Sequence, residues 1–246
     1  MWDRPDILNR ISGVLFALAL LLAAYGVLHF AIHLPFFSLR EVRLNRAPAH
    51  VTAEQLQTIV RRELKGNFFT LDLAAAKAAF EKLPWVRTVN VRRQWPARLD
   101  VELEEHVPLA RWGGAALVNT YGEEFKAAYE GNLPLFIGPA GTTKEVAIQY
   151  EYFRRSLAEI DKVPVQVQVS PRRAWQIRLG DGMTLELGRE QIETRLARFI
   201  SNYERTLGKL GRHVEYVDLR YANGYAVRIP GLKSEKSGPK GHRGAA

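Results

Sequence analysis

The feature that most constrains this chain is an uncharged, apolar segment near its start. The 22 residues from Ile11 to Ile32 include no Asp, Glu, Lys or Arg. As an α-helix rising about 1.5 Å per residue, this segment is roughly 33 Å long, enough to cross a hydrocarbon core of about 30 Å. The residues after Arg40 have the mixed composition of a water-soluble protein. The pattern therefore predicts one membrane-spanning helix that holds a large body on one side of a membrane.

Two other interpretations of this segment fit less well. A cleavable signal peptide has an apolar centre of about 7–15 residues, followed by small residues at the cleavage site. Here the apolar part is longer, and Tyr25, His29 and Phe30 occupy the region where small residues are needed. A buried core helix is usually shorter and has a polar face. We therefore expect an uncleaved transmembrane helix over residues 11–33, preceded by a short polar tail over residues 1–10.

The flanking charges do not decide the orientation of this helix. Two arginines precede it and three follow it at close range. For a helix with a cytoplasmic N-terminus, this distribution is opposite to the usual excess of Lys and Arg on the cytoplasmic side. Long domains, however, are translocated largely regardless of charge. The orientation has to be inferred from other evidence.

The composition of the chain limits the chemistry it can perform. The 246 residues contain no cysteine, which excludes disulfides, thiolate metal sites and cysteine nucleophiles. The net charge is +9, which fits nucleic acid, anionic lipid, an acidic partner or a polyanionic wall polymer. Because the basic residues are scattered along the sequence, a solvated basic surface is favoured over nucleic-acid binding.

The first part of the body predicts a small α+β domain over residues 38–106. Thr52 followed by Gln55 fits a capping box at the start of a helix. Alternating apolar residues then predict two half-buried antiparallel strands joined by a turn at Trp95-Pro96. The predicted order is β-α-α-β-β, over residues 41–45, 52–64, 72–83, 89–91 and 99–103.

The second part, residues 107–230, predicts a mixed or antiparallel β domain with flanking helices. Strands are expected at 109–112, 115–118, 163–169, 175–179, 183–187, 217–221 and 225–229, and helices at 145–160 and 192–207. In residues 163–169 all four valines alternate with other residues, which predicts one apolar face. Asn223-Gly224 between the last two runs indicates a tight hairpin turn. Residues 231–246 are rich in Lys, Ser, Gly and Pro, so we expect a disordered tail.

Motifs for enzyme chemistry are missing from the sequence. It contains no Gly-rich phosphate loop, no His-Glu-x-x-His and no Gly-x-Ser-x-Gly. A Ser-x-x-Lys match at residues 237–240 falls in the predicted disordered tail, and the six histidines lack metal-ligand spacing. Glu104-Glu105-His106 could form an acid–base group, but a solvated strand edge is the better interpretation. We therefore expect no enzymatic activity, no cofactor and no metal.

A binding function remains, and the last predicted hairpin is the candidate site. If residues 225–229 form the last strand of a sheet, they lie at an edge, where unpaired backbone groups can accept a partner strand. The alternative is that this hairpin simply closes the fold. The residue pattern alone favours that alternative.

Several short motifs, taken together, match one known family. The first group reads Leu83-Pro84-Trp85-Val86, Val89-x-Val91-Arg92-Arg93-x-Trp95-Pro96 and Leu99-x-Val101-x-Leu103-x-Glu105-x-x-Pro108-x-Ala110-x-Trp112. The last is Val217-Asp218-Leu219-Arg220-Tyr221 followed by Asn223-Gly224. Between them stand Trp175-Gln176-x-x-Leu179, Leu185-x-Leu187-Gly188-Arg189 and Arg195-Leu196-x-Arg198-Phe199. From the apolar segment to about Pro230, the chain resembles the POTRA-containing FtsQ/DivIB family of bacterial cell-division proteins.

The resemblance implies a location and a role. Members of this family are single-pass inner-membrane proteins with a cytoplasmic N-terminus and a periplasmic body, and they gather at the division septum. They are non-enzymatic scaffolds of the divisome that link early division proteins to the FtsB–FtsL subcomplex and to septal wall synthesis. FtsB is bound directly, by strand addition at the carboxy-terminal edge strand, and other divisome proteins are contacted through the POTRA domain and the transmembrane helix.

The resemblance also implies which residues contact the partner. Arg172 and Arg220 are expected to pair with carboxylates of the partner. Tyr221, Asn223 and Gly224 are expected to shape the contact at the turn, and the pairing strand is expected to include Tyr225, Ala226 and Val227. Recruitment contacts of the POTRA domain are expected near residues 60–68. The family's usual glycine after the first strand is missing at Leu44-Asn45-Arg46.

An alternative hypothesis is a POTRA-type periplasmic chaperone or a secretion and assembly subunit that holds unfolded clients. Proteins of that class normally repeat the POTRA unit or continue into a membrane β-barrel, and this sequence does neither. An anchored cell-wall enzyme is a third hypothesis, and it requires a deep cleft with convergent ionisable groups.

Overall fold

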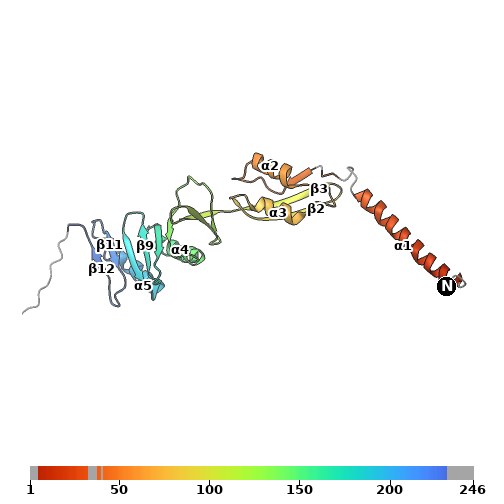
Figure 1. Cartoon of the computed structure of the whole chain (residues 1–246). Coiled ribbons are helices and arrows are strands. Elements are labelled where there is room, and N and C mark those ends of the chain that lie inside the picture. The colour runs from red at the N-terminus through yellow and green to blue at the C-terminus, as the bar shows by residue number, and fades with distance from the viewer. Residues whose placement is uncertain (1–4, 33–37, 40, 232–246) are drawn as a thin grey trace, which may run out of the picture. The chain divides into compact units, whose positions relative to one another are not determined.

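The computed structural model describes residues 5–32, 38–39 and 41–231, and side chains from residue 9 onward. The chain divides into two compact units, residues 1–106 and 107–246. Each unit is described by itself below (Figure 1). The first four residues of the predicted polar tail, residue 33 at the end of the predicted transmembrane helix, and the predicted disordered tail from residue 232 onward lie outside the described residues.

Helix α1 (Pro5–Ile32) is the long apolar element of the sequence. Its segment Asn9–Ile32 contains a stretch of 18 residues with a mean hydropathy of 2.4 and no buried residue, so the helix is long and apolar enough to cross a membrane. The helix begins earlier than the predicted residue 11. Pro5 suits the first turn of a helix, where its missing N–H costs no hydrogen bond, and the polar residues that follow continue the helix.

The first unit contains a three-stranded sheet in the order β1-β3-β2. Strand β1 (Glu41–Leu44) runs parallel to β3 (Arg98–Glu105), and β2 (Val86–Gln94) runs antiparallel to β3. Helices α2 (Ala53–Glu63) and α3 (Leu73–Glu81) follow β1 in the chain. The predicted β-α-α-β-β order is confirmed. A small core includes Leu56, Phe80, Val89, Leu99 and Val101.

Both helices of this unit begin at side-chain caps. The hydroxyl of Thr52 accepts a hydrogen bond from the Gln55 backbone N–H (3.3 Å), and the Gln55 side chain accepts from the Thr52 N–H (3.0 Å). The predicted capping box is therefore present. At α3, Asp72 Oδ1 accepts from the backbone N–H groups of Ala74 (2.8 Å) and Ala75 (3.1 Å). These caps satisfy N–H groups that the first helical turn leaves unpaired.

Glu105, at the end of β3, has a structural role that its sequence position did not indicate. Its carboxylate accepts hydrogen bonds from the backbone N–H groups of Ala49 (2.7 Å), His50 (2.9 Å) and Val51 (2.8 Å). The ring of His50 stacks on Trp85, with ring centroids 3.9 Å apart. Glu105 therefore attaches the segment that leads into α2 to the sheet, instead of lying on a solvated strand edge.

The second unit is a mixed nine-stranded sheet in the order β12-β11-β10-β9-β8-β7-β4-β5-β6. Its strands are β4 (Pro108–Trp112), β5 (Ala116–Asn119), β6 (Glu124–Phe125), β7 (Leu135–Ile137), β8 (Pro164–Val169), β9 (Trp175–Leu179), β10 (Thr184–Gly188), β11 (Tyr216–Asp218) and β12 (Ala226–Arg228). Helices α4 (Thr143–Ala158) and α5 (Ile192–Tyr203) contribute to one core with the sheet (Figure 1). The core's fully buried side chains include Phe136, Phe153, Ile177, Leu185, Leu196 and Phe199.

Two short strands were not predicted from the sequence. β6 has two residues and β7 has three, and β7 lies between Pro134 and Gly138. Strand β7 pairs in parallel with both β4 and β8. Because so short a segment shows no periodicity, only its pairing with distant strands identifies it.

The predicted apolar face of residues 163–169 is only half correct. Val167 and Val169 are buried, but Val163 and Val165 are exposed. The pairing of β8 with β9 contains a register shift between Pro164 and Gln166. Such a bulge reverses the side-chain alternation locally, so the first two valines point away from the core.

Replacing Glu105 with alanine is expected to weaken the segment before α2. Three backbone N–H groups lose their charged acceptor, at a cost of about 1–3 kcal/mol in unfolding free energy. Amide hydrogen exchange of the full chain in detergent should show faster exchange at residues 49–51.

The control for this prediction is Glu104→Ala. The Glu104 side chain is exposed and forms an ion pair with Arg87 at 3.0 Å. Exposed ion pairs contribute about 0–1 kcal/mol. If both variants leave exchange at residues 49–51 unchanged, Glu105 does not hold this segment.

Candidate functional site: the carboxy-terminal sheet edge

Strand β12 lies at one end of the nine-stranded sheet. It pairs antiparallel with β11, and no described strand lies on its other flank. All three of its residues are exposed. The residue pattern alone did not favour an edge position for the last strand, whereas the family resemblance implied one. Among the described strands, β12 does lie at the edge.

The hydrogen bonds of β11 determine its orientation in the sheet. The Thr184 N–H donates to the Glu215 carbonyl (2.9 Å), and the Leu219 N–H donates to the Glu186 carbonyl (2.9 Å). In a parallel pair with this register, these bonds direct the backbone groups of Val217 toward β10. Along a strand, the backbone N–H and C=O groups of successive residues point alternately to its two flanks. Tyr216 and Asp218, on either side of Val217, therefore direct their backbone groups toward β12.

This orientation determines which backbone groups of β12 are available. Tyr216 pairs with Arg228, and Asp218 pairs with Ala226. Ala226 and Arg228 therefore direct their N–H and C=O groups toward β11, and the Arg228 carbonyl accepts a bond from the residue just before β11 (3.1 Å). Val227 lies between them, so its N–H and C=O point toward the open flank.

The side chains beside this open backbone are apolar. Val227 is 37% exposed, and Tyr225 and Ile229, two residues away on either side, pack against the core of the unit. A visiting strand that bonds to Val227 could extend this apolar surface.

The structure corrects the expected position of Tyr225. It precedes β12 instead of forming part of the pairing strand. Its ring packs edge-on against Phe199 of α5, with centroids 5.9 Å apart, and its hydroxyl forms a hydrogen bond with the Thr206 hydroxyl. These contacts direct the side chain into its own unit, so Tyr225 positions the end of the strand.

The structure also corrects the expected Asn-Gly turn. β11 ends at Asp218 and β12 begins at Ala226, so residues 219–225 form a longer loop. Neither Asn223 nor Gly224 has the positive φ that a two-residue type I′ turn requires. Tyr221 lies in this loop and is 58% exposed.

Arg198, on α5, holds this loop. Its guanidinium donates to the carbonyl oxygens of Leu219 (3.4 Å), Tyr221 (2.7 Å) and Ala222. Asn202, one helical turn further, bonds back to the Arg198 carbonyl (2.9 Å). The sequence interpretation used Arg198 only as part of a motif, because nothing in a sequence shows that a helix residue reaches carbonyls about 20 residues away.

Arg220 is already paired within the unit. Its Nε and Nη2 donate to the two carboxylate oxygens of Asp218 at 2.9 and 2.7 Å, and its backbone N–H donates to Asp218 Oδ1 at 3.0 Å. The Arg220 hydrogen bond lowers the pKa of the buried Asp218 carboxyl below its ordinary value of 3.8. The Arg220 side chain remains 57% exposed, so the guanidinium can still contact a partner.

Arg172 and Arg220, expected to act together, line the same shallow depression of about 350 Å³. Gly188 forms part of its wall with a φ of +73°, and a Cβ there would lie 2.9 Å from Arg195 Nη1 and 3.1 Å from Arg220 Cγ. The depression is lined by Arg172, Ala174, Glu186, Gly188, Arg189, Glu190, Arg195 and Arg220. Its four arginines and two glutamates suit a partner with carboxylate side chains.

The expected site residues therefore divide into three groups. Arg172 and Arg220 meet at the depression, Ala226 and Val227 form the edge strand, and Tyr221, Asn223, Gly224 and Tyr225 belong to the loop between β11 and β12. Within the described part of the chain, no group of three or more His, Cys, Asp or Glu could hold a metal ion.

Replacing Arg198 with alanine is expected to loosen the loop while leaving the sheet intact. Three carbonyl contacts disappear, which corresponds to about 1–3 kcal/mol of local stability. Amide exchange over residues 219–226 should rise. Arg205→Ala, an exposed arginine just after α5, is the matched control. Equal exchange in both variants would contradict a role for Arg198 in holding the loop.

The Asp218–Arg220 pair predicts a pH dependence of stability. Because the folded pKa of Asp218 lies below its unfolded value, its contribution is fully present above about pH 4 and is lost as pH falls through the folded pKa. Acid unfolding of the second unit should therefore be less steep below pH 4 in Asp218→Asn than in the native chain. Identical profiles would show that the ion pair does not contribute.

The comparisons with known proteins agree with this architecture. Residues 37–106 match the model of the POTRA domain of FtsQ type, and residues 110–220 match that of cell division protein FtsQ/DivIB, C-terminal. The chain is 46% identical to the cell division protein FtsQ of Nitrosospira multiformis over 93% of this chain and 99% of that protein. It is 40% identical to the FtsQ of Burkholderia pseudomallei, over 99% of this chain and 100% of that protein.

These matches cover both units as well as the apolar helix. The similarity extends to the FtsQ of Neisseria gonorrhoeae, at 33% identity over 96% of this chain and 100% of that protein. Together with the POTRA order of the first unit and the mixed sheet of the second, they establish that this chain belongs to the FtsQ family of bacterial cell-division proteins.

Proposed function

We propose that this protein is a non-enzymatic scaffold of the divisome that binds FtsB by strand addition at β12. In this role it links early division proteins to the FtsB–FtsL subcomplex and to septal peptidoglycan synthesis. The observation that carries the proposal is the open flank of β12, where the N–H and C=O of Val227 have no neighbouring strand among the described residues.

Membership of the family supports the proposed location. The α1 helix would cross the inner membrane once, with the N-terminus in the cytoplasm and both units in the periplasm, enriched at the division septum. Its length and hydropathy fit a single span.

Side chains near the edge would add specificity to the backbone pairing. Strand addition obtains affinity from backbone hydrogen bonds and selectivity from neighbouring side chains. Arg172 and Arg220 line one depression. Acidic residues of the partner, placed beside its added strand, would pair with these guanidiniums.

The first unit is proposed to recruit other divisome proteins. Residues Val60, Arg61, Leu64 and Gly66 line a groove of about 650 Å³ between α2 and β1, within the range 60–68 expected from the family resemblance. Strand β1 is itself a sheet edge. Both features suit the docking of a peptide segment.

The decisive test replaces Val227 with proline and measures capture of FtsB by the full chain. Proline removes the backbone N–H that points to the open flank, while the hydrogen bonds of Ala226 and Arg228 to β11 remain. We expect capture to be lost. Ala226→Pro is a less specific test, because it removes a donor that faces β11.

The matched control is Val227→Thr, which changes the side chain but keeps the backbone donor. We expect it to capture FtsB as the native chain does. Retained capture by a folded Val227→Pro chain, verified by amide exchange across β10 and β11, would show that the partner does not bind by strand addition here.

A further inference from the structure

The first unit has an exposed aromatic surface at one end. Trp95, in the turn between β2 and β3, is 66% exposed, and Phe69, in the loop before α3, is 45% exposed. Both rings meet the buried Phe68 edge-on, with centroids 5.8 and 5.3 Å away. We call Lys65, Phe69, Arg93 and Trp95 the aromatic tip. Two large exposed rings fixed on one buried ring are unusual for a solvated loop.

The loop that presents Phe69 has a defined structure. Asn67 Oδ1 accepts hydrogen bonds from the backbone N–H groups of Phe69 and Thr70, both at 3.0 Å. Gly66 adopts a φ of +112°, and a Cβ there would lie 2.9 Å from Thr70 Oγ1. The loop is therefore held in the conformation that exposes Phe69.

The chain connection places this tip close to α1. Ser38 forms an isolated bridge with Asn67, directly beside Phe68. Ser38 follows the last residue of α1, Ile32, by six positions. Since an extended chain spans at most about 3.6 Å per residue, Ser38 lies within roughly 22 Å of the end of α1. This limit holds for any arrangement of the intervening residues.

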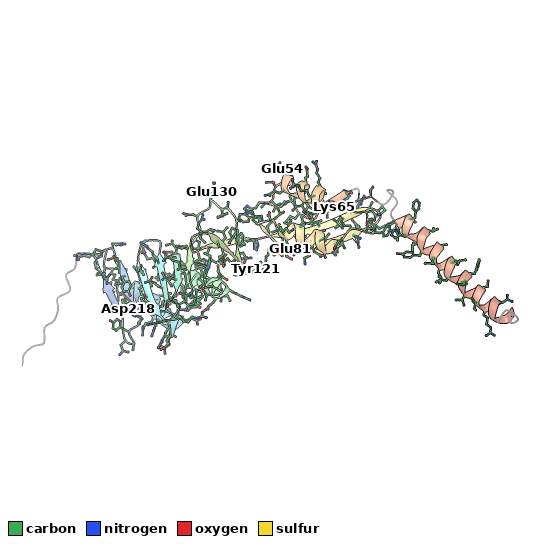
Figure 2. The ribbon with its side chains drawn as sticks, viewed as in Figure 1. Glu54, Lys65, Glu81, Tyr121, Glu130 and Asp218 are labelled. Carbon is green, nitrogen blue, oxygen red and sulfur yellow. The ribbon has the colours of Figure 1, made fainter. Side chains whose placement is uncertain are left out.

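The strand register places the turn with Trp95 at the same end. The first residue of β1, Glu41, lies beside the first residue of β3, Arg98, which follows Trp95 by three positions. The chain enters β1 from the direction of α1. The loop of the aromatic tip follows the end of α2 and precedes the start of α3. Glu54, near the start of α2, and Glu81, at the end of α3, belong to the helix ends that lie away from the tip (Figure 2).

The aromatic tip carries two exposed cations. Lys65 and Arg93 are exposed, and Arg93 Nη2 donates to the carbonyl oxygens of Leu71 and Phe69, neutral groups that leave its charge in place. The carboxylate of Glu41 is shared by Arg43 (2.8 Å) and Arg98 (3.0 Å). Exposed aromatic rings flanked by cations are typical of a membrane–water interface.

We propose that the aromatic tip rests in the headgroup layer of the bilayer that α1 crosses. The rings of Phe69 and Trp95 lie at the boundary with the acyl chains, and Lys65 and Arg93 face the phosphates of anionic lipids. The proposal rests on α1 spanning the membrane. Its consequence is that the first unit is held close to the lipid surface.

The test uses spin labels on the full chain in nanodiscs of phosphatidylethanolamine and phosphatidylglycerol. Because the chain has no cysteine, each introduced cysteine is the single labelling site. Phe69→Cys reports on the tip, Leu21→Cys on the middle of α1, and Ile148→Cys, at an exposed position of α4, on solvent. Relative accessibility to oxygen and to a nickel chelate gives the depth of each label.

We expect the label at residue 69 to lie in the headgroup layer, the label at 21 to lie deep in the bilayer, and the label at 148 to be aqueous. An additional Trp95→Ser change, or a bilayer of phosphatidylcholine alone, should shift the label at 69 toward water. An aqueous label at 69 with a deep label at 21 overturns the proposal but not the membrane span; a protein partner would then be the remaining occupant of the tip. An aqueous label at 21 overturns both.

A second measurement leaves Phe69 unchanged. Brominated lipids quench tryptophan fluorescence on contact, so the native chain should lose more emission than Trp95→Phe. Equal quenching in the two chains would contradict contact of Trp95 with lipid. Val227→Pro should not alter either readout, which separates this proposal from strand addition at β12.

Discussion

The parallel pairing of β10 with β11 determines the properties of the carboxy-terminal edge. Its hydrogen bonds direct the backbone of Val217 toward β10, and the alternation of a strand then directs Val227 of β12 outward. If the pairing of β10 with β11 were shifted by one residue, the N–H and C=O of Val227 would point toward β11 instead of toward the open flank. The backbone groups that the edge exposes therefore depend on a contact one strand away from it.

Interactions within the second unit keep this edge open and ordered. Arg198 holds the carbonyls of the preceding loop, Tyr225 packs on Phe199, and Arg220 pairs with Asp218. An ordered edge loses less conformational entropy when a partner strand is added. The same contacts prevent the edge strand from leaving the sheet, so the surface is preformed.

Much of the fold could be predicted from the sequence. The apolar segment predicted α1, Thr52 and Gln55 predicted the capping box, and alternating runs predicted most strands of the second unit. The prediction failed where the determining partner is distant in sequence. Short β7 forms only between β4 and β8, the exposure of Val165 follows from a bulge against β9, and Glu105 bonds residues more than 50 positions away.

The sequence by itself determined the existence of a membrane-length helix, the β-α-α-β-β order, and the presence of a last strand with apolar alternation. These follow from local composition and periodicity, which act over a few residues. Only the tertiary structure decided that β12 lies at the sheet edge, that Val227 directs its backbone outward, and that Phe69 and Trp95 share one exposed tip. The physical reason is that strand order and side-chain contact depend on pairing between distant segments, and a local pattern does not specify that pairing.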